Sequence, residues 1–192
     1  MSPLNVEIKA RCDDPERVRK VLEERGADFR GTDHQVDTYF HCRTGRLKLR
    51  EGRIENALIH YDRPDQPAPK PALVTLYHPP PDPALKAVLT AGLGVRAVVD
   101  KTREIYFIDN VKFHIDVVGP LGAFVEIEAI DADGSIGLED LTAQCRGYMD
   151  LFGIAPADLI DGSYGDMLSR RAAEPARPPP CRPSGNPAGP AP

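Results

Sequence analysis

Arg46-Leu47-Lys48-Leu49-Arg50 alternates basic and apolar residues without interruption. In a β-strand successive side chains point to opposite faces, so the basic residues would form one row and the leucines would enter a core. A half-buried antiparallel strand commonly shows the same alternation, with its charged face in water. The stretch predicts a strand, but on its own it does not decide whether the basic row is a solvated face or part of an anion-binding site.

The same period-two alternation continues through most of the chain. It predicts strands at residues 4–11, 35–40, 46–51, 57–63, 73–77, 95–108, 111–118 and 124–130. Short connections, such as Asp109-Asn110, make consecutive strands antiparallel neighbours. Helix-start signatures at Asp14-Pro15 and Asp82-Pro83, with helical spacing over residues 138–152, predict three main helices. We therefore predict an α+β fold dominated by antiparallel sheet.

The composition limits the classes of protein to which the chain can belong. Its formal net charge of −5 over 192 residues argues against a general nucleic-acid binder, because such a protein needs a basic surface. No apolar run approaches the length of a membrane span. The four cysteines lack CxxC spacing and follow no signal-like segment, which favours a reduced, cytoplasmic setting; they are Cys12, Cys42, Cys145 and Cys181.

The end of the chain differs in composition from the rest. From Glu174 onward it is rich in proline, glycine and alanine, and no apolar periodicity remains. Such a segment buries too little apolar surface to fold by itself. We expect one domain over residues 1–170 and a disordered, proline-rich tail over residues 171–192.

Charged residues follow the same alternation on the polar faces of the predicted strands. The basic ones lie mainly on the earlier and middle strands: Lys9, Lys48, Arg50, Arg63, Lys101 and Arg103. The carboxylates lie on the last two strands and on the first: Glu7, Asp116, Glu126 and Glu128. If the sheet curls so that this face turns inward, the lumen has a basic wall and an acidic wall. Such a lumen suits a polyphosphate, whose oxygens the basic groups neutralise, together with a divalent cation held by carboxylates.

Six motifs, in order from about residue 4 to residue 168, resemble the CYTH superfamily of class IV adenylate cyclases and thiamine triphosphatases, also called triphosphate tunnel metalloenzymes. Any one of them is weak, but the six in register are specific. They are Asn5-Val6-Glu7-Ile8-Lys9-Ala10, Gln35-x-Asp37-Thr38-Tyr39-Phe40, Leu47-Lys48-Leu49-Arg50-Glu51, Tyr61-Asp62-Arg63-Pro64-Asp65, Lys101-Thr102-Arg103 and Phe124-Val125-Glu126-Ile127-Glu128.

The resemblance implies an eight-stranded antiparallel β tunnel or barrel with flanking helices, which binds a triphosphate along its axis. The residues that match the family's triphosphate-binding positions are Lys9, Lys48, Arg50, Arg63, Lys101 and Arg103. Those that match its metal-binding carboxylates are Glu7, Asp116, Glu126 and Glu128, and the expected cofactor is Mg²⁺ or Mn²⁺. Catalysis is expected to depend on Glu7, Lys9, Glu126 and Glu128.

The activity that the resemblance implies first is that of a class IV adenylate cyclase, which converts ATP to cyclic AMP and pyrophosphate. An inorganic or thiamine triphosphatase uses the same walls, because phosphoryl transfer depends mainly on positioning and charge stabilisation. A non-catalytic module that binds triphosphate or polyphosphate is a third reading. The expected partner is a small-molecule triphosphate, without nucleic acid or membrane, and a homodimer is left open.

One position departs from the family pattern. The N-terminal signature of the family is E-x-E-x-K, and its first glutamate is replaced here by Asn5. Asparagine offers a neutral carbonyl oxygen where a charged ligand would lie, so a metal at that end should bind less tightly. The basic row is intact, which makes triphosphate binding a firmer expectation than turnover.

Several neighbouring residues allow two interpretations. Asp37 and Tyr39 are read either as a packing hydrogen-bond pair or as substrate contacts. His114 shares a face with the acidic residues, but a site of the Mg²⁺ type favours oxygen, so a packing role is the simpler reading. Arg46 lies near a turn and is left outside the predicted site, and Tyr164 receives no catalytic role.

Overall fold

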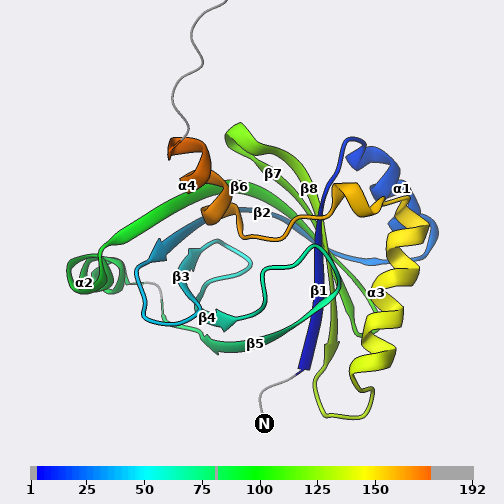
Figure 1. Ribbon diagram of the computed structural model, residues 1–192, viewed down its shortest axis with the longest axis horizontal. Coiled ribbons are helices and arrows are strands. Elements are labelled where there is room, and N and C mark those ends of the chain that lie inside the picture. The colour runs from blue at the N-terminus through cyan, green and yellow to red at the C-terminus, as the bar shows by residue number, and fades with distance from the viewer. Residues whose placement is uncertain (1–3, 81, 174–192) are drawn as a thin grey trace, which may run out of the picture.

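The computed structural model, which describes residues 4–80 and 82–173, is built around a closed antiparallel barrel (Figure 1). Among the described residues, eight strands follow one another around the barrel in the order β1-β5-β4-β3-β2-β6-β7-β8. Their bounds are β1 Leu4–Arg11, β2 Asp28–Phe40, β3 Arg46–Glu51, β4 Ala57–Asp62, β5 Lys70–Tyr77, β6 Val95–Ile108, β7 Val111–Val118 and β8 Gly122–Asp131. The structure confirms the predicted eight-stranded barrel of the α+β class.

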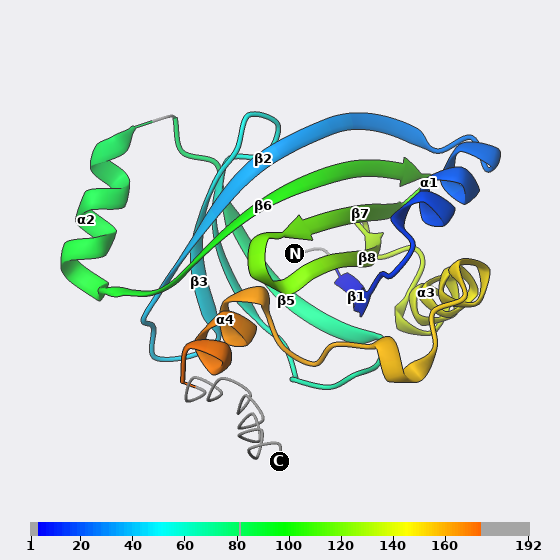
Figure 2. The same cartoon turned by 90° about the horizontal axis from the view of Figure 1, so that it is seen from above.

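Helices lie on the outside and at one end of this barrel (Figure 2). The four α-helices of the described residues are α1 Pro15–Glu24, α2 Pro83–Leu93, α3 Leu138–Phe152 and α4 Tyr164–Ala173. The side chains of Asp14 and Asp82 cap α1 and α2, and a proline follows each cap, as the sequence predicts. No helix among the described residues is both long enough and apolar enough to span a membrane.

The main hydrophobic core lies between one outer face of the barrel and the helices α1 and α3. It contains Val6 and Ile8 of β1, whose neighbours in sequence face the lumen. The helices contribute Leu22 from α1 and Leu141 and Cys145 from α3, all fully buried. Because a strand alternates its faces, burying one set of residues against these helices turns the other, charged set inward.

A smaller core lies at one end of the barrel, beneath α4. Tyr164, the first residue of α4, packs with Tyr39 and Phe124, which come from β2 and β8. A side chain at Gly165 would lie 3.0 Å from the Tyr39 ring, so a glycine lets the helix approach the strand closely. We refer to this end of the barrel as its mouth.

The structure differs from the predicted elements in three places. The strands predicted at 35–40 and 73–77 begin earlier, at Asp28 and Lys70, because long neighbouring strands supply their backbone partners. Helix α4 was not predicted. It begins at a capping box, in which Ser163 and Asp166 exchange side-chain to backbone hydrogen bonds. Of the predicted tail, residues up to Ala173 are helical and residues 174–192 lie outside the described residues.

Candidate functional site

The order of the strands sets the two groups of predicted charges across the lumen from one another. Counted around the barrel, β3 lies four strands from β8 in either direction, so the two strands are on opposite sides. Lys48 and Arg50 project inward from β3, and Glu126 and Glu128 project inward from β8. The structure places all of the predicted triphosphate-binding and metal-binding residues on this inner face.

The acidic wall is assembled by pairing between three neighbouring strands. In the register of β1 and β8, Glu7 lies beside Glu128 and Lys9 beside Glu126; in that of β7 and β8, His114 lies beside Glu126. Potential metal-binding atoms of His114, Glu126 and Glu128 all lie within 4.8 Å of one another. The three side chains therefore form one compact group with a nitrogen and two carboxylate oxygens as donors.

The two carboxylates of this group differ in their partners. Glu126 contacts Lys9 at 2.9 Å and Arg103 at 2.7 Å, whereas the side chain found near the Glu128 carboxylate in the described part of the chain is the His114 imidazole, at 3.5 Å. Burial, with Arg103 close by, lowers the pKa of His114, so that its imidazole is neutral near pH 7. Neutral imidazole and carboxylate are both good ligands for a divalent cation.

Glu7 completes the acidic wall from β1. It lies 2.6 Å from Arg63, although the pair does not have the alignment of a hydrogen bond. Burial raises the pKa of Glu7, and the nearby Glu128 and Glu126 raise it further against the opposing effect of Arg63. Three carboxylates that repel one another in a buried space favour a cation between them.

Unpartnered polar atoms are a second sign that the acidic wall is made for a ligand. Within the described residues, Asn5 Oδ1 and His114 Nε2 are buried and have no hydrogen-bond partner. Such atoms are rare in native proteins, because burial without a partner is unfavourable. Asn5 is on β1, two residues from Glu7 on the same face. The donor set, rich in carboxylate oxygen, fits the divalent cation that the resemblance implies.

The basic wall is organised around one carboxylate, that of Asp37 on β2. It is 0% exposed and lies 2.9 Å from Lys48 Nζ, 2.9 Å from Arg50 Nε and 3.4 Å from Lys101 Nζ. Burial alone would raise the pKa of this carboxyl, but Arg50, Lys101 and Lys48 hold it well below its ordinary value. The hydrogen bonds found for Asp37 in the described residues go to Lys48, Arg50 and Lys101, and none goes to Tyr39, the packing partner that the sequence suggested. Asp37 therefore positions three basic side chains.

Lys101 is a buried lysine of the basic wall whose pKa lies well below the ordinary value. Burial, together with the positive charges of Arg103 and Arg50, lowers the pKa of Lys101 to about 7. The two carboxylates near it, Asp37 and Asp116, oppose this shift without cancelling it. The charge of the basic wall therefore changes near neutral pH.

Arg103 joins the two walls. Its guanidinium contacts Asp116 at 2.5 and 2.7 Å and Glu126 at 2.7 Å. Tyr164 also donates a hydrogen bond to Asp116, at 2.8 Å, and its ring lies 3.7 Å from Lys9 Nζ. The carboxylate of Asp116, a predicted metal ligand, is thus already occupied by Arg103 and Tyr164.

Sequence reasoning missed two members of the site. Glu55, in the loop before β4, accepts hydrogen bonds from Arg50 at 2.7 Å and Gln35 at 3.0 Å, and no periodicity marks a loop residue. Arg46 was set aside as a residue near a turn, but its side chain is only 10% exposed and contacts both Asp65 and Asp166. The strict alternation of the β3 row was the signal that could have included it.

The fold and its charged lumen together define a closed β-barrel protein whose candidate site lies inside the barrel. Compared with known families, residues 3–149 match the sequence profile of the CYTH domain. The chain belongs to the CYTH family. A comparison with curated proteins gave no match.

Solved structures share this fold at low sequence identity. The PH1012 protein of Pyrococcus horikoshii is 24% identical, over 84% of this chain and 98% of its own, with a TM-score of 0.69. A Vibrio parahaemolyticus protein, proposed to be an adenylate cyclase, is 18% identical over 88% of this chain and 99% of its own, with a TM-score of 0.68. HpAC1 from Hippeastrum, a proposed adenylyl cyclase with a dominant triphosphatase activity, is 13% identical over 88% of this chain and 96% of its own, with a TM-score of 0.55.

Proposed function

We propose that the chain is a divalent-metal-dependent enzyme that binds a triphosphate along the barrel axis. The observation that carries this proposal is the position of β8, with Glu126 and Glu128, directly across the lumen from β3, with Lys48 and Arg50. A triphosphate in complex with a divalent cation presents both signs of charge and matches both walls at once.

In this proposal the basic wall of the lumen would bind the phosphates and the acidic wall would bind the metal ion. Lys48, Arg50, Lys101 and Arg103 would bind phosphate oxygens and hold the chain of phosphates in one orientation. Glu7, Glu126 and Glu128 would hold Mg²⁺ or Mn²⁺, which would neutralise charge on the reacting phosphate. Asp116 stays a predicted ligand that would first have to release Arg103, with which it now pairs.

Two reactions are compatible with these walls. Hydrolysis of an inorganic triphosphate is our first candidate. The described residues that line the pocket at the mouth of the barrel are charged residues, a serine and a glycine, and none of them has an aromatic ring on which a nucleobase could stack. Cyclisation of ATP is the second candidate. It is favoured by two buried tyrosine rings, Tyr39 and Tyr61, which lie 5.5 and 5.8 Å from Lys48 Nζ and could stack on adenine.

One product analysis tests the proposal and separates the candidates. The protein is incubated with inorganic triphosphate, thiamine triphosphate or ATP, each with Mg²⁺ or Mn²⁺, and the products are separated. Orthophosphate supports the hydrolase, and cyclic AMP with pyrophosphate supports the cyclase. Triphosphate binding without turnover in any mixture would leave only the binding module.

The basic wall can be tested separately through binding. Lys48→Ala with Arg50→Ala should weaken triphosphate binding and reduce its dependence on salt, because two charge contacts are lost. The matched control is Lys20→Ala with Arg25→Ala, which removes two exposed charges from α1. Equal affinities of the two double variants would exclude the β3 row from the site.

A further inference from the structure

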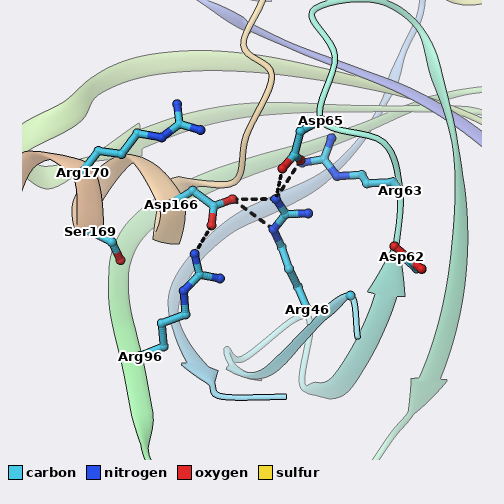
Figure 3. Close-up of a pocket in the computed structure, with 9 residues that line it drawn as sticks. Arg46, Asp62, Arg63, Asp65, Arg96, Asp166, Ser169 and Arg170 are labelled. Carbon is cyan, nitrogen blue, oxygen red and sulfur yellow. Dashed lines mark hydrogen bonds and ion pairs between the residues drawn. The ribbon is translucent and has the colours of Figure 1, made fainter. Parts of the chain in front are cut away.

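A second charged pocket lies at the mouth of the barrel, outside the lumen site. It has a volume of about 470 Å³ and lies where α4 meets β3, β6 and the segment that follows β4 (Figure 3). Four arginines line it: Arg46, Arg63, Arg96 and Arg170. The other lining residues are aspartates, a serine and a glycine, so within residues 4–80 and 82–173 no aromatic or apolar side chain borders the pocket.

Carboxylates of the chain itself contact all four arginines. Arg63 pairs with Glu7 and Arg170 with Asp161, and the closest network joins the other two. Arg46 contacts Asp65 at 2.7 Å and Asp166 at 2.9 Å, and Arg96 reaches the other oxygen of Asp166. Figure 3 shows Arg46 and Arg96 converging on the Asp166 carboxylate from β3 and β6. Two guanidinium groups that converge on one carboxylate have the same arrangement as arginines that bind a phosphate.

Arg63 is a second basic side chain of the pocket with donors that the chain does not fully use. It is 7% exposed, and its Nε and Nη1 atoms are buried without an aligned hydrogen bond among the described residues, although Nη1 lies 2.6 Å from the Glu7 carboxylate. The hydrogen bond that it does make, from Nη2 to the carbonyl of Gly162, is long at 3.4 Å. A buried guanidinium has five donors to satisfy, and an anion with several oxygens would satisfy those left over.

The pocket continues the basic row of the lumen. Arg46 precedes Lys48 and Arg50 on the same face of β3, each about 7 Å from the next along the strand. Arg63 takes part in both places, since it pairs with Glu7 in the lumen and also lines the pocket. Basic side chains therefore lead from the lumen to the mouth.

We propose that this mouth pocket is a further phosphate subsite, and that the chain binds linear inorganic polyphosphates longer than triphosphate. This inference rests on the proposed triphosphate site, which it extends outward. The additional phosphate contacts Arg46, Arg63 and Arg96. On Arg46 it replaces the carboxylates of Asp65 and Asp166, and on Arg96 it replaces that of Asp166. The lack of any ring or apolar wall favours another phosphate over an organic group at this position.

The test compares linear tetraphosphate with triphosphate by calorimetry, at constant ionic strength and with a metal chelator. One more phosphate with charge-assisted hydrogen bonds should tighten binding about tenfold. A tetraphosphate that merely slides in the lumen has two registers for binding, which gives a gain of about twofold from counting alone. A ratio of twofold or less for the native protein would overturn the inference.

The arginines are tested by the same ratio of affinities. Arg46→Gln with Arg96→Gln should reduce the ratio to about twofold, as sliding alone gives. Arg96→Gln alone, which changes a side chain that is 37% exposed, gives a reduced ratio if the double variant does not fold. Arg25→Gln with Arg146→Gln should keep the native ratio, because both side chains are exposed, lie at the end of α1 and within α3, and do not line the pocket.

The outcomes separate this inference from the function on which it rests. An unchanged ratio in the mouth variants would overturn the phosphate subsite. Triphosphate binding without a gain for tetraphosphate would overturn the subsite and leave the proposed function standing. Absence of binding by either polyphosphate, both with the chelator and with added Mg²⁺, would overturn both.

Discussion

Asp37→Asn is expected to destabilise the ligand-free barrel. The carboxylate is 0% exposed and lies 2.9 Å from both Lys48 Nζ and Arg50 Nε, with Lys101 Nζ at 3.4 Å. Removing one partner of a buried ion pair costs about 3–5 kcal/mol, because the remaining charges stay buried without compensation. At about 2–4 °C per kcal/mol for a domain of this size, the melting temperature should fall by about 6–20 °C.

The same variant should respond more strongly to triphosphate than the native protein does. In the variant, Lys48, Arg50 and Lys101 lack the negative charge of Asp37, and a bound triphosphate would supply it. Triphosphate should therefore stabilise the variant more than it stabilises the native protein. Melting is followed by circular dichroism with and without inorganic triphosphate, in the presence of a chelator. Asp100→Asn is the matched control, because this aspartate is 69% exposed on the outer face of β6 and pairs with His34 at the surface. The reasoning fails if Asp37→Asn melts like the control, or if triphosphate stabilises it less than the native protein.

Three further predictions concern the remaining charges of the lumen. Lys101 has a pKa of about 7 and would bind phosphate in its charged form. Triphosphate affinity, measured by calorimetry without metal, should therefore be highest below pH 7 and fall as the pH rises above it. Lys101→Met should flatten this profile, and an equally steep profile in the variant would contradict the assignment. Glu126→Gln with Glu128→Gln should abolish metal-stimulated turnover and weaken Mn²⁺ binding while circular dichroism stays native; activity that survives these changes, or chelation, excludes these carboxylates as metal ligands. Asn5→Glu should tighten Mn²⁺ binding about tenfold or more, because it restores a charged oxygen ligand beside Glu7, and calorimetry that finds equal affinities would show that position 5 does not face the cation.

The strands and the face of each charged residue could be predicted from the sequence, because both depend on a local period of two. Lys48 and Glu126 alternate with apolar neighbours, which places each of them on the opposite face of its strand from those neighbours. The helices α1 and α2 were marked by a capping aspartate followed by proline, which is also local. Features that depend on a few consecutive residues, namely the strands, the helix starts and the face of each strand residue, could therefore be predicted from the sequence.

The contacts between charges could not be predicted in the same way, because they depend on strands that are distant in sequence. Asp37 meets Lys101, and Arg46 meets Asp166, only after the barrel has closed and α4 has reached its mouth. Nothing near Asp37 indicates that it organises three cations. Glu55 stands in a loop without any period, and its contact with Arg50 became visible only in three dimensions.

The lumen of the ligand-free barrel is neutralised by its own side chains, and this shapes what it can bind. Glu126 is paired with Lys9 and Arg103, and Arg103 also holds Asp116. An anion that drew these cations away by itself would leave Glu126 buried without a positive partner, so metal-free binding should be weaker than binding of the metal complex. A polyphosphate that arrives with a divalent cation avoids this, because phosphate oxygens replace the carboxylates on the basic groups while the metal replaces the basic groups on the carboxylates. Under the proposed function, the need for a metal would thus follow from the ion pairs of this chain as well as from the charge on the reacting phosphate.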